Sequence, residues 1–514
     1  MNQVPALKLT DLTKRFGGKV IANDHVSMEC YHGEILSLLG ENGSGKTTLM
    51  NMIAGIYYPD EGTIAIDGRE VVIRSPRDAF EYGIGMIHQH FKLVDVFTAA
   101  ENVVLGLPEE GRLDRKATAA KVKAICEKYG FDLDPNEKVY NMTVSQKQAL
   151  EIVKVLYRGA NILILDEPTA VLTPQETKRL FEVLRMMRAD GKCVIIITHK
   201  LNEVLELSDR VSVLRKGKYV GTIDTCDATV EKLTEMMVGE KVELNIGRTE
   251  PHDMKLRLEV KNLNAHNKEG LQVLKDVSFT AHSGEILGIA GIAGNGQKEL
   301  LEAIAGLCRV DSGSIEYTAP EAEKPSELVG KTPMAISNLG VKLSFVPEDR
   351  LGMGLVGSMD MTENMMLRSY RRGHSIFADR KAPHSLAVDI KERLEVVTPS
   401  VETPVSLLSG GNVQKVLVGR EIAAAPTVLM TAYAVRGLDI NTSYTIYNLL
   451  NEQKEKGVAV IFVGEDLDVL LELCDRILVI GSGRVTGIVD GRTTTKDEVG
   501  LLMTKTEHAG GEQA

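Results

Sequence analysis

Short apolar runs recur along the chain and predict buried strands. Residues 34–39 read Glu-Ile-Leu-Ser-Leu-Leu and end at a glycine, and residues 162–165 are wholly aliphatic before two carboxylates. Such short runs are typical of strands buried on both faces of a parallel sheet. The apolar positions after the first run instead follow a helical period: Leu49, Met52, Ile53 and Ile56. A strand followed by a helix predicts an α/β fold.

A glycine loop joins this strand to this helix. Its sequence, GENGSGKTT, matches the phosphate-loop pattern G-x-x-x-x-G-K-[ST] without a mismatch. The glycines let backbone amides turn toward phosphate oxygens, and the helix N-terminus adds partial positive charge. We expect Lys46 to reach the β- and γ-phosphates and the Thr47 hydroxyl to bind Mg²⁺. The nucleotide-binding positions predicted here are Gly40, Glu41, Asn42, Gly43, Ser44, Gly45, Lys46, Thr47 and Thr48.

The second half of the chain repeats the first. The segments DHVS and GEIL of residues 24–36 recur as DVSF and GEIL in residues 276–287, at an offset close to the 251 that aligns the two glycine loops. Further on, LSDR at residues 207–210 matches LCDR at residues 473–476, at an offset of 266. The offset grows by 15, which predicts an insertion in the second copy, within residues 317–339.

Each copy is too long for a solenoid repeat and has its own strand, glycine loop and helix. The repeat therefore predicts two homologous domains, residues 5–240 and 256–504. The polar residues 241–255 are the expected linker, and residues 505–514 are expected to be a disordered tail.

Composition narrows the function. The 514 residues are 43% hydrophobic and 25% charged, as in ordinary soluble globular proteins. Sixty basic against 71 acidic side chains give a net charge of −11, which argues against nucleic-acid binding as the main activity. Six scattered cysteines without a C-x-x-C pair indicate a reduced chain without a disulfide framework or zinc site. No secretory signal or membrane-spanning run is recognisable.

Together these motifs resemble a known family. The glycine loop, the strand with Asp-Glu-Pro at residues 162–168, and Ile-Thr-His at residues 197–199 look like the nucleotide-binding domain of an ATP-binding cassette (ABC) transporter. The whole chain resembles the tandem-cassette ATPases of bacterial sugar and nucleoside importers. The resemblance implies an α/β fold with two P-loop NTPase domains, each with a RecA-like core, an antiparallel β subdomain and a helical subdomain. It also implies that the two cassettes pair head to tail within the chain.

The same resemblance assigns roles in the first domain. Phe16 lies where these cassettes stack a ring on adenine, and Gln89 matches the glutamine that contacts Mg²⁺ and the attacking water. Asp166 would hold Mg²⁺, and Glu167 would be the general base. His199 fits the histidine that contacts the γ-phosphate. The expected catalytic residues are thus Glu167, His199 and Gln89, and the expected metal ligands Thr47, Gln89 and Asp166.

The second domain lacks this chemistry. Gln297 replaces the loop lysine, and Lys298 replaces the magnesium-binding threonine. Ala432 and Tyr433 replace the two carboxylates, and Glu465 replaces the histidine. The glutamine position falls in the segment Pro-Glu-Asp-Arg at residues 347–350. We expect this site not to hydrolyse nucleotide efficiently.

The signature motifs show the opposite asymmetry. The second domain carries LSGGNVQK at residues 408–415, close to the L-S-G-G-[QN] of the family, whereas residues 142–146 of the first domain have both glycines replaced. Side chains there should hinder close approach of the backbone to phosphate. Head-to-tail pairing then combines the intact loop with the intact signature, and the expected binding residues there are Ser409, Gly410, Gly411 and Asn412.

The resemblance implies an ATPase that energises solute import, with ATP and Mg²⁺ as cofactors. Its implied partners are two integral membrane permease subunits and, indirectly, an extracytoplasmic solute-binding protein, with no nucleic acid. The chain would lie peripherally on the cytoplasmic face of the plasma membrane.

The solute class is left open. Residues 88–94, 157–161 and 170–174 look more like nucleoside importers than monosaccharide importers, and simple sugars are the alternative. A soluble tandem cassette acting on ribosomes or DNA is an alternative of another class. The short linker of mixed charge and the one-sided loss of catalytic residues argue against it. A nucleotide-sensing regulator without turnover is a third alternative, which the intact Glu167 disfavours.

Overall fold

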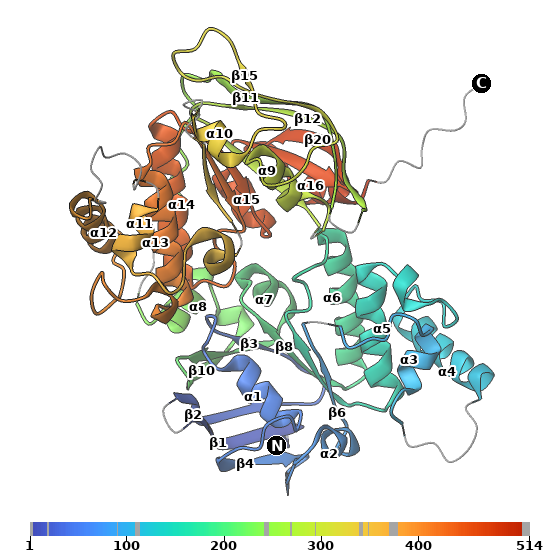
Figure 1. The fold of residues 1–514 in the computed structure, drawn as a ribbon. Helices are drawn as coiled ribbons and strands as arrows, with labels where there is room; N and C mark the ends of the chain where they lie inside the picture. Colours follow the sequence, from blue (N-terminus) through green and yellow to red (C-terminus); the bar gives the residue numbers. More distant parts are fainter. Residues whose placement is uncertain are drawn as a thin grey trace, which may run out of the picture. The chain divides into compact units, whose positions relative to one another are not determined.

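In the computed structural model the chain forms two compact units, Met1–Glu243 and Leu244–Ala514 (Figure 1). The residues described are 4–17, 20–89, 91–107, 114–240, 246–267, 270–292, 294–338, 343–347, 349–367, 369 and 379–505. The tail expected beyond residue 505, the first five residues of the expected linker, His90 and Glu348 lie outside the described residues.

A six-stranded sheet forms the centre of unit 1, with the order β10-β9-β3-β8-β7-β6. Its strands pair in parallel except for β10, which runs antiparallel to β9 at one edge. The strands are β3 (Ile35–Leu39), β6 (Ile84–Ile87), β7 (Ile162–Asp166), β8 (Cys193–Thr198), β9 (Arg210–Arg215) and β10 (Lys218–Asp224). Every residue of β3, β7 and β8 is buried, as expected for parallel strands covered on both faces.

Successive residues of β3 face opposite layers. Ile35 packs in a cluster with α5 (Val144–Tyr157) and α6 (Pro174–Ala189), whereas Leu36 packs in a cluster with α1 (Lys46–Ile53) and the antiparallel sheet. That second sheet has the order β2-β1-β4-β5. Its strands are β1 (Leu7–Phe16), β2 (Val20–Cys30), β4 (Glu61–Ile66) and β5 (Arg69–Val71).

Helices α3 (Ala99–Val104), α4 (Arg115–Tyr129) and α5 share a separate apolar cluster, which is the core of a helical subdomain. The remaining helices of unit 1 are α2 (Pro76–Glu81), α7 (Leu201–Leu207) and α8 (Val230–Val238). Unit 1 therefore has the three expected parts: a mostly parallel core, an antiparallel sheet and a helical subdomain.

Unit 2 repeats this plan. Its central sheet has the order β16-β17-β18-β13-β19-β20, and its antiparallel sheet has the order β12-β11-β14-β15. The strands are β11 (Leu256–His266), β12 (Gln272–His282), β13 (Ile286–Gly291), β14 (Ser312–Tyr317), β15 (Ser326–Glu327), β16 (Leu343–Val346), β17 (Val428–Ala432), β18 (Ala459–Val463), β19 (Arg476–Gly481) and β20 (Arg484–Asp490). The helices are α9 (Gln297–Ile304), α10 (Pro333–Asn338), α11 (Met361–Met366), α12 (Lys381–Arg393), α13 (Gly410–Ala423), α14 (Ile440–Glu455), α15 (Leu467–Leu473) and α16 (Lys496–Thr504). The predicted fold class is confirmed.

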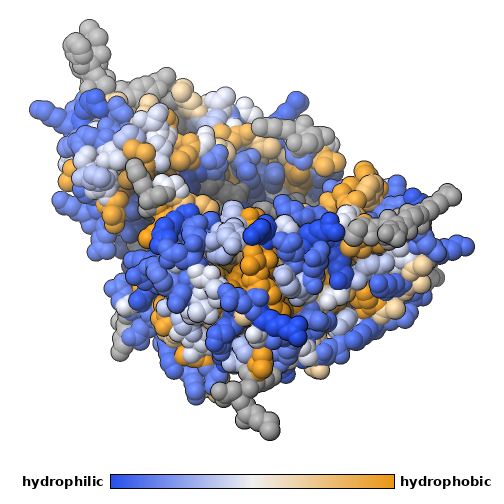
Figure 2. All heavy atoms as spheres, turned by 90° about the horizontal axis from the view of Figure 1, so that it is seen from below, coloured by the Kyte–Doolittle hydropathy of each residue, from blue (hydrophilic) through white to orange (hydrophobic). Residues whose placement is uncertain are grey.

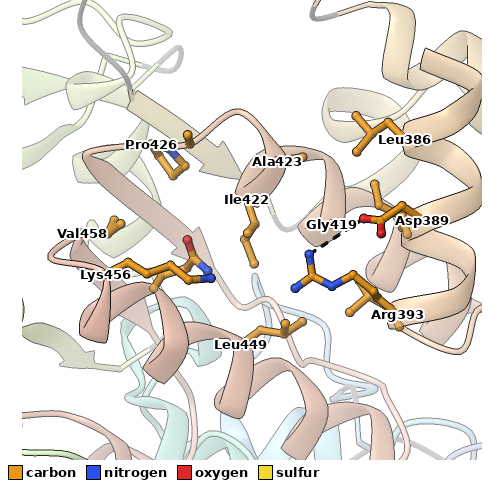
Figure 3. A pocket seen from close by; sticks show the side chains of 14 residues that line it. Leu386, Asp389, Arg393, Gly419, Ile422, Ala423, Pro426, Leu449, Lys456 and Val458 are labelled. Carbon is orange, nitrogen blue, oxygen red and sulfur yellow. Dashed lines mark ion pairs between the residues drawn. The ribbon is translucent and has the colours of Figure 1, made fainter. Parts of the chain in front are cut away.

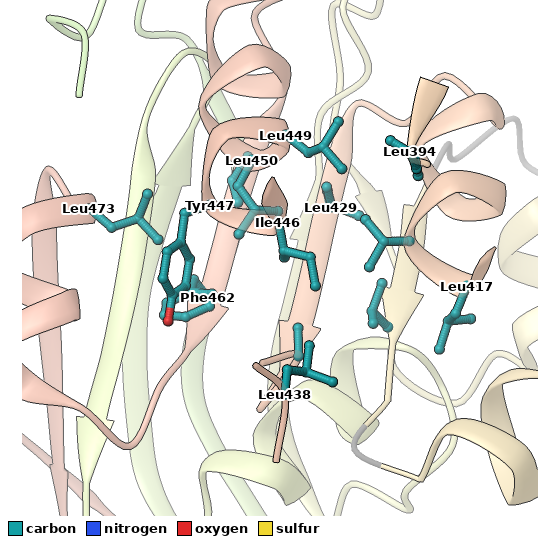
Figure 4. Close-up of a cluster of buried hydrophobic side chains, with 14 of the residues drawn as sticks. Leu394, Leu417, Leu429, Leu438, Ile446, Tyr447, Leu449, Leu450, Phe462 and Leu473 are labelled. Atoms are coloured by element: carbon teal, nitrogen blue, oxygen red, sulfur yellow. The ribbon is translucent and has the colours of Figure 1, made fainter. Parts of the chain in front are cut away.

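The largest apolar cluster of unit 2 lies where α14 packs on the central sheet (Figure 4). Tyr447 of α14 meets Phe462 of β18 edge to face, with ring centroids 6.1 Å apart. Leu394, Leu417 and Leu429 join this cluster from three different elements, so the helical part and the sheet share one core.

The extra residues of unit 2 are spread along the chain, which corrects the prediction of a single insertion within residues 317–339. The offset is 251 where β1 and β11 pair with their neighbours, 257 between α2 and α10, and 259 between β6 and β16. It then reaches 262 at α3 and α11, and 266 at α5 and α13. Only part of the growth thus falls in the predicted segment, between β14 and α10, and the rest follows farther along.

Residues 246–255 of the expected linker belong structurally to unit 2. Ile246 is buried in its apolar cluster, and the Arg248 guanidinium donates hydrogen bonds to the carbonyls of Leu471 (2.9 Å) and Cys474 (2.7 Å). This segment is therefore anchored before β11 begins.

The surface in Figure 2 is mostly hydrophilic, with hydrophobic side chains in separate patches. Among the residues that the structure describes, no helix combines the length and apolar character needed to cross a bilayer.

Candidate nucleotide site

The predicted phosphate loop of unit 1 has a backbone that glycine alone fits. Gly43 and Gly45 have φ of 80° and 97°, and Gly45 is the N-cap of α1. A Cβ on Gly45 would lie 2.3 Å from the Ala22 carbonyl oxygen, and one on Gly40 would lie 2.4 Å from the Leu214 carbonyl oxygen. The loop is thus wedged between neighbouring backbone segments, and its glycines are sterically required.

The ammonium of Lys46 lies within this loop. It donates hydrogen bonds to the carbonyls of Gly40 (2.7 Å) and Glu41 (2.9 Å), and the residue is 6% exposed. Burial lowers the pKa of Lys46, while the nearby carboxylates of Glu167 and Asp166 act in the opposite direction. A buried cation at the mouth of a glycine loop suits an anionic ligand.

The rest of the loop offers further groups to such a ligand. The Ser44 hydroxyl is buried and has no hydrogen-bond partner, which is uncommon in native proteins. A phosphate oxygen of a bound ligand would be such a partner. Asn42 and Gly43 are exposed beside it, and Thr47 and Thr48 lie in the first turn of α1. The helix N-terminus adds its partial positive charge.

Asp166 ends strand β7 beside this loop and is 9% exposed. Burial, with the adjacent Glu167 carboxylate, raises the pKa of Asp166 to about 6, although Lys46 acts to lower it. Keeping Asp166 ionised at this buried position therefore costs free energy, which a bound cation would offset.

Glu167 brings the other predicted catalytic residues together. Its Oε1 lies 2.9 Å from His199 Nδ1, and its Oε2 accepts a hydrogen bond of 3.2 Å from the Gln89 amide. Burial tends to raise the pKa of Glu167, but the contact with His199 and the charge of Lys46 outweigh it and lower that pKa. The side chain is thus held as a carboxylate.

These residues meet because neighbouring parallel strands end at the same edge of the sheet. Gln89 follows β6, Glu167 follows β7, and His199 follows β8. In open α/β sheets, ligands bind at these carboxyl ends.

Phe16 ends strand β1 and is 39% exposed. Its ring meets Tyr57 edge to face, with centroids 5.3 Å apart. The strand pairings of β1 and β11 place Asn267 at the corresponding position of unit 2. Unit 2 therefore lacks an aromatic ring at this position, a difference that the sequence motifs did not indicate.

The predicted metal ligands fit magnesium chemically. A threonine hydroxyl, an amide oxygen and a carboxylate, from Thr47, Gln89 and Asp166, are hard oxygen donors of the kind that Mg²⁺ prefers. The raised pKa of Asp166 supports this fit, because a cation would relieve the cost of its buried charge.

Unit 2 builds the same loop without the same chemistry. Gly294 and Gly296 have φ of 89° and 101°, close to their counterparts in unit 1. The buried Gln297 donates a hydrogen bond of 3.0 Å to the Ile292 carbonyl, so a neutral amide occupies the place of the ammonium. Lys298 lies 4.0 Å from Glu302 in an ion pair along α9.

The corresponding edge of unit 2 keeps this backbone but lacks the two carboxylates and the histidine of unit 1. Tyr433 has φ 52° and donates its amide to Val463, as Glu167 has φ 46° and donates its amide to Ile197. Ala432 is buried among apolar side chains. Glu465, at the histidine position, lies 3.3 Å from the Arg436 guanidinium.

The signature of unit 2 forms a helix start. Ser409 is the N-cap of α13, and its hydroxyl accepts hydrogen bonds from the Asn412 backbone amide (3.4 Å) and side-chain amide (2.9 Å). The side-chain Oδ1 of Asn412 accepts a hydrogen bond from the Val397 backbone amide at 2.9 Å. Gly410 and Gly411 form the first two positions of the helix and carry no side chains of their own.

The corresponding helix start in unit 1 is capped by its own side chains. Thr143 caps α5 through a reciprocal pair of hydrogen bonds with Gln146. Val144 and Ser145 stand where the glycines do in unit 2.

Arg350 is a second residue that sequence reasoning passed over. Its guanidinium donates a hydrogen bond to the Arg436 carbonyl and lies 3.1 Å from the place that a Cβ on Gly410 would take. The only signal was its place in the segment that replaces the glutamine motif.

Each unit thus combines a phosphate loop, a mostly parallel core and a helix-borne signature, which together define a tandem phosphate-loop ATPase. The profile of the ABC transporter family matches residues 23–170 and 274–431. The chain belongs to the ABC transporter family, as an ATP-binding subunit with two cassettes.

Curated relatives match over nearly the full length. The chain is 41% identical over 502 residues to the nucleoside import ATP-binding protein NupA of Lactococcus lactis, covering 97% of each chain. It is 40% identical to the guanosine import ATP-binding protein NupO of Bacillus subtilis, again covering 97% of each. It is 38% identical to the ribose import ATP-binding protein RbsA 1 of Rubrobacter xylanophilus, covering 99% of this chain and 100% of that one.

Proposed function

We propose that this ATPase subunit energises the import of nucleosides. Two relatives at 41% and 40% identity are named for nucleoside or guanosine import, and one at 38% is named for ribose import. Monosaccharide import is the second candidate, because the margin in identity is narrow and the solute does not contact this kind of subunit.

The contacts and the lowered pKa of Glu167 are the main support for ATP hydrolysis by this chain. Its carboxylate contacts His199 and Gln89, and its lowered pKa keeps it ionised near neutral pH. An ionised carboxylate can accept a hydrogen bond from water and draw its proton, which is the role of a general base. Glu167 is therefore the proposed base, with His199 and Gln89 fixing its orientation.

The loop residues are proposed to bind and orient the nucleotide. Lys46 would hold the β- and γ-phosphates by charge, and the free Ser44 hydroxyl and the amides of the loop would contact phosphate oxygens. The half-exposed ring of Phe16 would stack on adenine. Thr47, Gln89 and Asp166 would hold Mg²⁺, which when bound neutralises phosphate charge.

The asymmetry between the units supports one hydrolytic site. Tyr433 takes up the backbone pose of Glu167 but cannot act as a carboxylate base, and Gln297 takes the place of Lys46 without its charge. In this proposal the loop of unit 1 works with the signature of unit 2, Ser409, Gly410, Gly411 and Asn412. The boundaries 5–240, 241–255 and 256–504 remain the proposed division of the chain.

The proposed partners are two permease subunits in the plasma membrane, on whose cytoplasmic face the chain would lie, and a solute-binding protein beyond them. The chain would bind no nucleic acid.

Reconstitution tests this proposal. The chain would be purified with its membrane subunits, placed in liposomes, and assayed for ATP hydrolysis with the solute receptor loaded with guanosine or with ribose. We expect guanosine to stimulate hydrolysis and ribose not to. Stimulation by ribose alone would favour the second candidate, and recovery of the chain on ribosomes or nucleic acid would overturn both.

A further inference from the structure

Unit 2 contains a cavity of about 340 Å³ between its helical subdomain and its core (Figure 3). Its walls come from α12, the C-terminal half of α13, α14 and the start of β18, and they are mainly aliphatic. In Figure 3, Ile422 and Leu449 point into this space, and the side chains of Asp389, Arg393 and Lys456 stand around it. Apolar cavities of this size with few polar groups are typical of small-molecule sites.

The repeat shows how the cavity arises. Helices α5 and α13 match end to end at an offset of 266, as do α6 and α14. At this offset Gly419 of unit 2 corresponds to Val153 of unit 1, and Ala423 corresponds to Tyr157. Val153 is fully buried in unit 1, and Tyr157 packs against the same cluster. Only Ala423 leaves unfilled room, because the side chains of Ile390 and Leu394 pack beside Gly419, 2.9 and 3.1 Å from the place that a Cβ there would take.

A second wall position also carries a smaller side chain than its counterpart in unit 1. Tyr129 ends α4 just before Gly130, which has φ 72°, and Leu394 follows α12 just before Glu395, which has φ 49°. The buried Tyr129 ring thus corresponds to the smaller Leu394. Native cores are close-packed, so the two reductions in side-chain size at Ala423 and Leu394 leave room for a ligand.

One wall residue changes from apolar to polar. Gln453 of α14 corresponds to Met187, which is fully buried in the apolar core of unit 1. Gln453 is 3% exposed and lines the cavity, yet its amide nitrogen has no hydrogen-bond partner. Burying an amide without a hydrogen-bond partner costs free energy, and a ligand that pairs with it would remove this cost.

The charges at the rim are already paired. Arg393 lies 3.9 Å from Asp389, and Lys456 lies 3.9 Å from Glu452. The cavity therefore attracts no net charge, and its polar recognition rests on the amide of Gln453, which offers one donor side and one acceptor side.

This cavity is separate from the nucleotide positions of unit 2. It adjoins the N-terminal start of β18 and the loop before β17, through Val458 and Pro426. The glycine loop and Tyr433 follow the opposite, C-terminal ends of β13 and β17. The cavity does, however, touch the helix whose first residue follows Ser409, so a ligand there would contact the helix that presents the signature.

We propose that this cavity binds a neutral, mainly apolar small molecule with one cyclic-amide edge. The aliphatic walls take its apolar body, and its carbonyl and N–H pair with Gln453 as an amide pairs with the edge of a base. Such a lactam edge occurs in free nucleobases and in other heterocycles, and a titration with one probe of each class distinguishes them.

Calorimetric titration of the full-length chain tests this site. The probes are 2-quinolone, a bicyclic lactam; N-methyl-2-quinolone, which lacks the donor; and hypoxanthine, a nucleobase. We expect 2-quinolone to bind with a micromolar Kd and its N-methyl form to bind about tenfold more weakly. Binding of hypoxanthine as well would identify a nucleobase as the source, and binding of 2-quinolone alone would identify another lactam.

Two of the variants introduce the residue that unit 1 has at the corresponding position. Ala423→Tyr should abolish binding by filling the space. Gln453→Met should weaken 2-quinolone at least tenfold and the N-methyl form by less, because the N-methyl form keeps the carbonyl but not the N–H that pairs with Gln453. Glu392→Ala, at an exposed position outside the cavity lining, should leave the affinity unchanged. Absence of binding by every probe, or equal affinity in the wild type and Gln453→Met, would overturn the proposal. Gln453→Met replaces a residue by its unit 1 counterpart of similar size, so its result stands even if Ala423→Tyr fails to fold.

Discussion

Asp166 should destabilise the nucleotide-free protein at neutral pH. The carboxyl is 9% exposed, and its pKa is raised from 3.8 to about 6 by burial and by the neighbouring Glu167. The folded state therefore holds the proton more tightly than the unfolded chain, so ionising this group costs free energy of folding. At about 1.36 kcal/mol per pKa unit, this shift corresponds to roughly 3 kcal/mol.

The sign and the pH window follow from that shift. Because the pKa of the folded state is raised, the cost is fully present above about pH 6 and disappears as the pH falls toward 3.8. Asp166→Asn, which mimics the protonated group, should stabilise unit 1 above pH 6 and have little effect near pH 4. For a domain of this size, roughly 3 kcal/mol would raise the Tm by about 6–12 °C.

Thermal unfolding in EDTA without nucleotide, at pH 8 and pH 4, measures this difference. Asp190→Asn is a matched control, because Asp190 is an exposed carboxylate whose pKa is lowered by its contact with Lys128. The control should not gain stability at pH 8. An unchanged Tm for Asp166→Asn at pH 8, or an equal gain at pH 4, would refute the reasoning.

Three further predictions concern the loop and the ring. Lys46→Ala should lower ATP hydrolysis at least 100-fold by removing the buried charge, whereas Gln297→Ala should change it less than about threefold; steady-state phosphate release distinguishes them. Phe16→Ala should raise the KM for ATP about 3- to 10-fold with little change in kcat, since a stacked ring contributes about 0.5–1.5 kcal/mol; an unchanged KM would exclude stacking. Gly40→Ala should cost about 1–3 kcal/mol of stability in a denaturant titration, because its Cβ would meet the Leu214 carbonyl at 2.4 Å; a stable variant would contradict the steric account.

Much of the fold follows from local signals in the sequence. Strand β3, the glycine loop and α1 are adjacent along the chain, so periodicity and the motif locate them without tertiary information. The repeat then transfers the same plan to the second half. The convergence of Gln89, Glu167 and His199 is also predictable, since each follows a strand of one parallel sheet.

Other features depend on packing that the sequence does not show. The growing offset in unit 2 comes from several short additions, which two anchor motifs cannot separate. The anchoring of Ile246 and Arg248 onto unit 2 depends on surfaces far away in the chain. The cavity beside Gln453 depends on changes at three positions, Leu394, Ala423 and Gln453, that lie around one space, and no single replacement signals it.

Comparing the ATPase rates of Glu167→Gln and Tyr433→Phe under saturating ATP tests whether unit 1 carries the one hydrolytic site. The two residues have the same left-handed backbone and the same amide hydrogen bond to the neighbouring strand. We expect a loss of at least 100-fold for Glu167→Gln, as for removal of a general base, and a change within about twofold for Tyr433→Phe. Substantial turnover in Glu167→Gln, or an equal loss in Tyr433→Phe, would contradict this expectation.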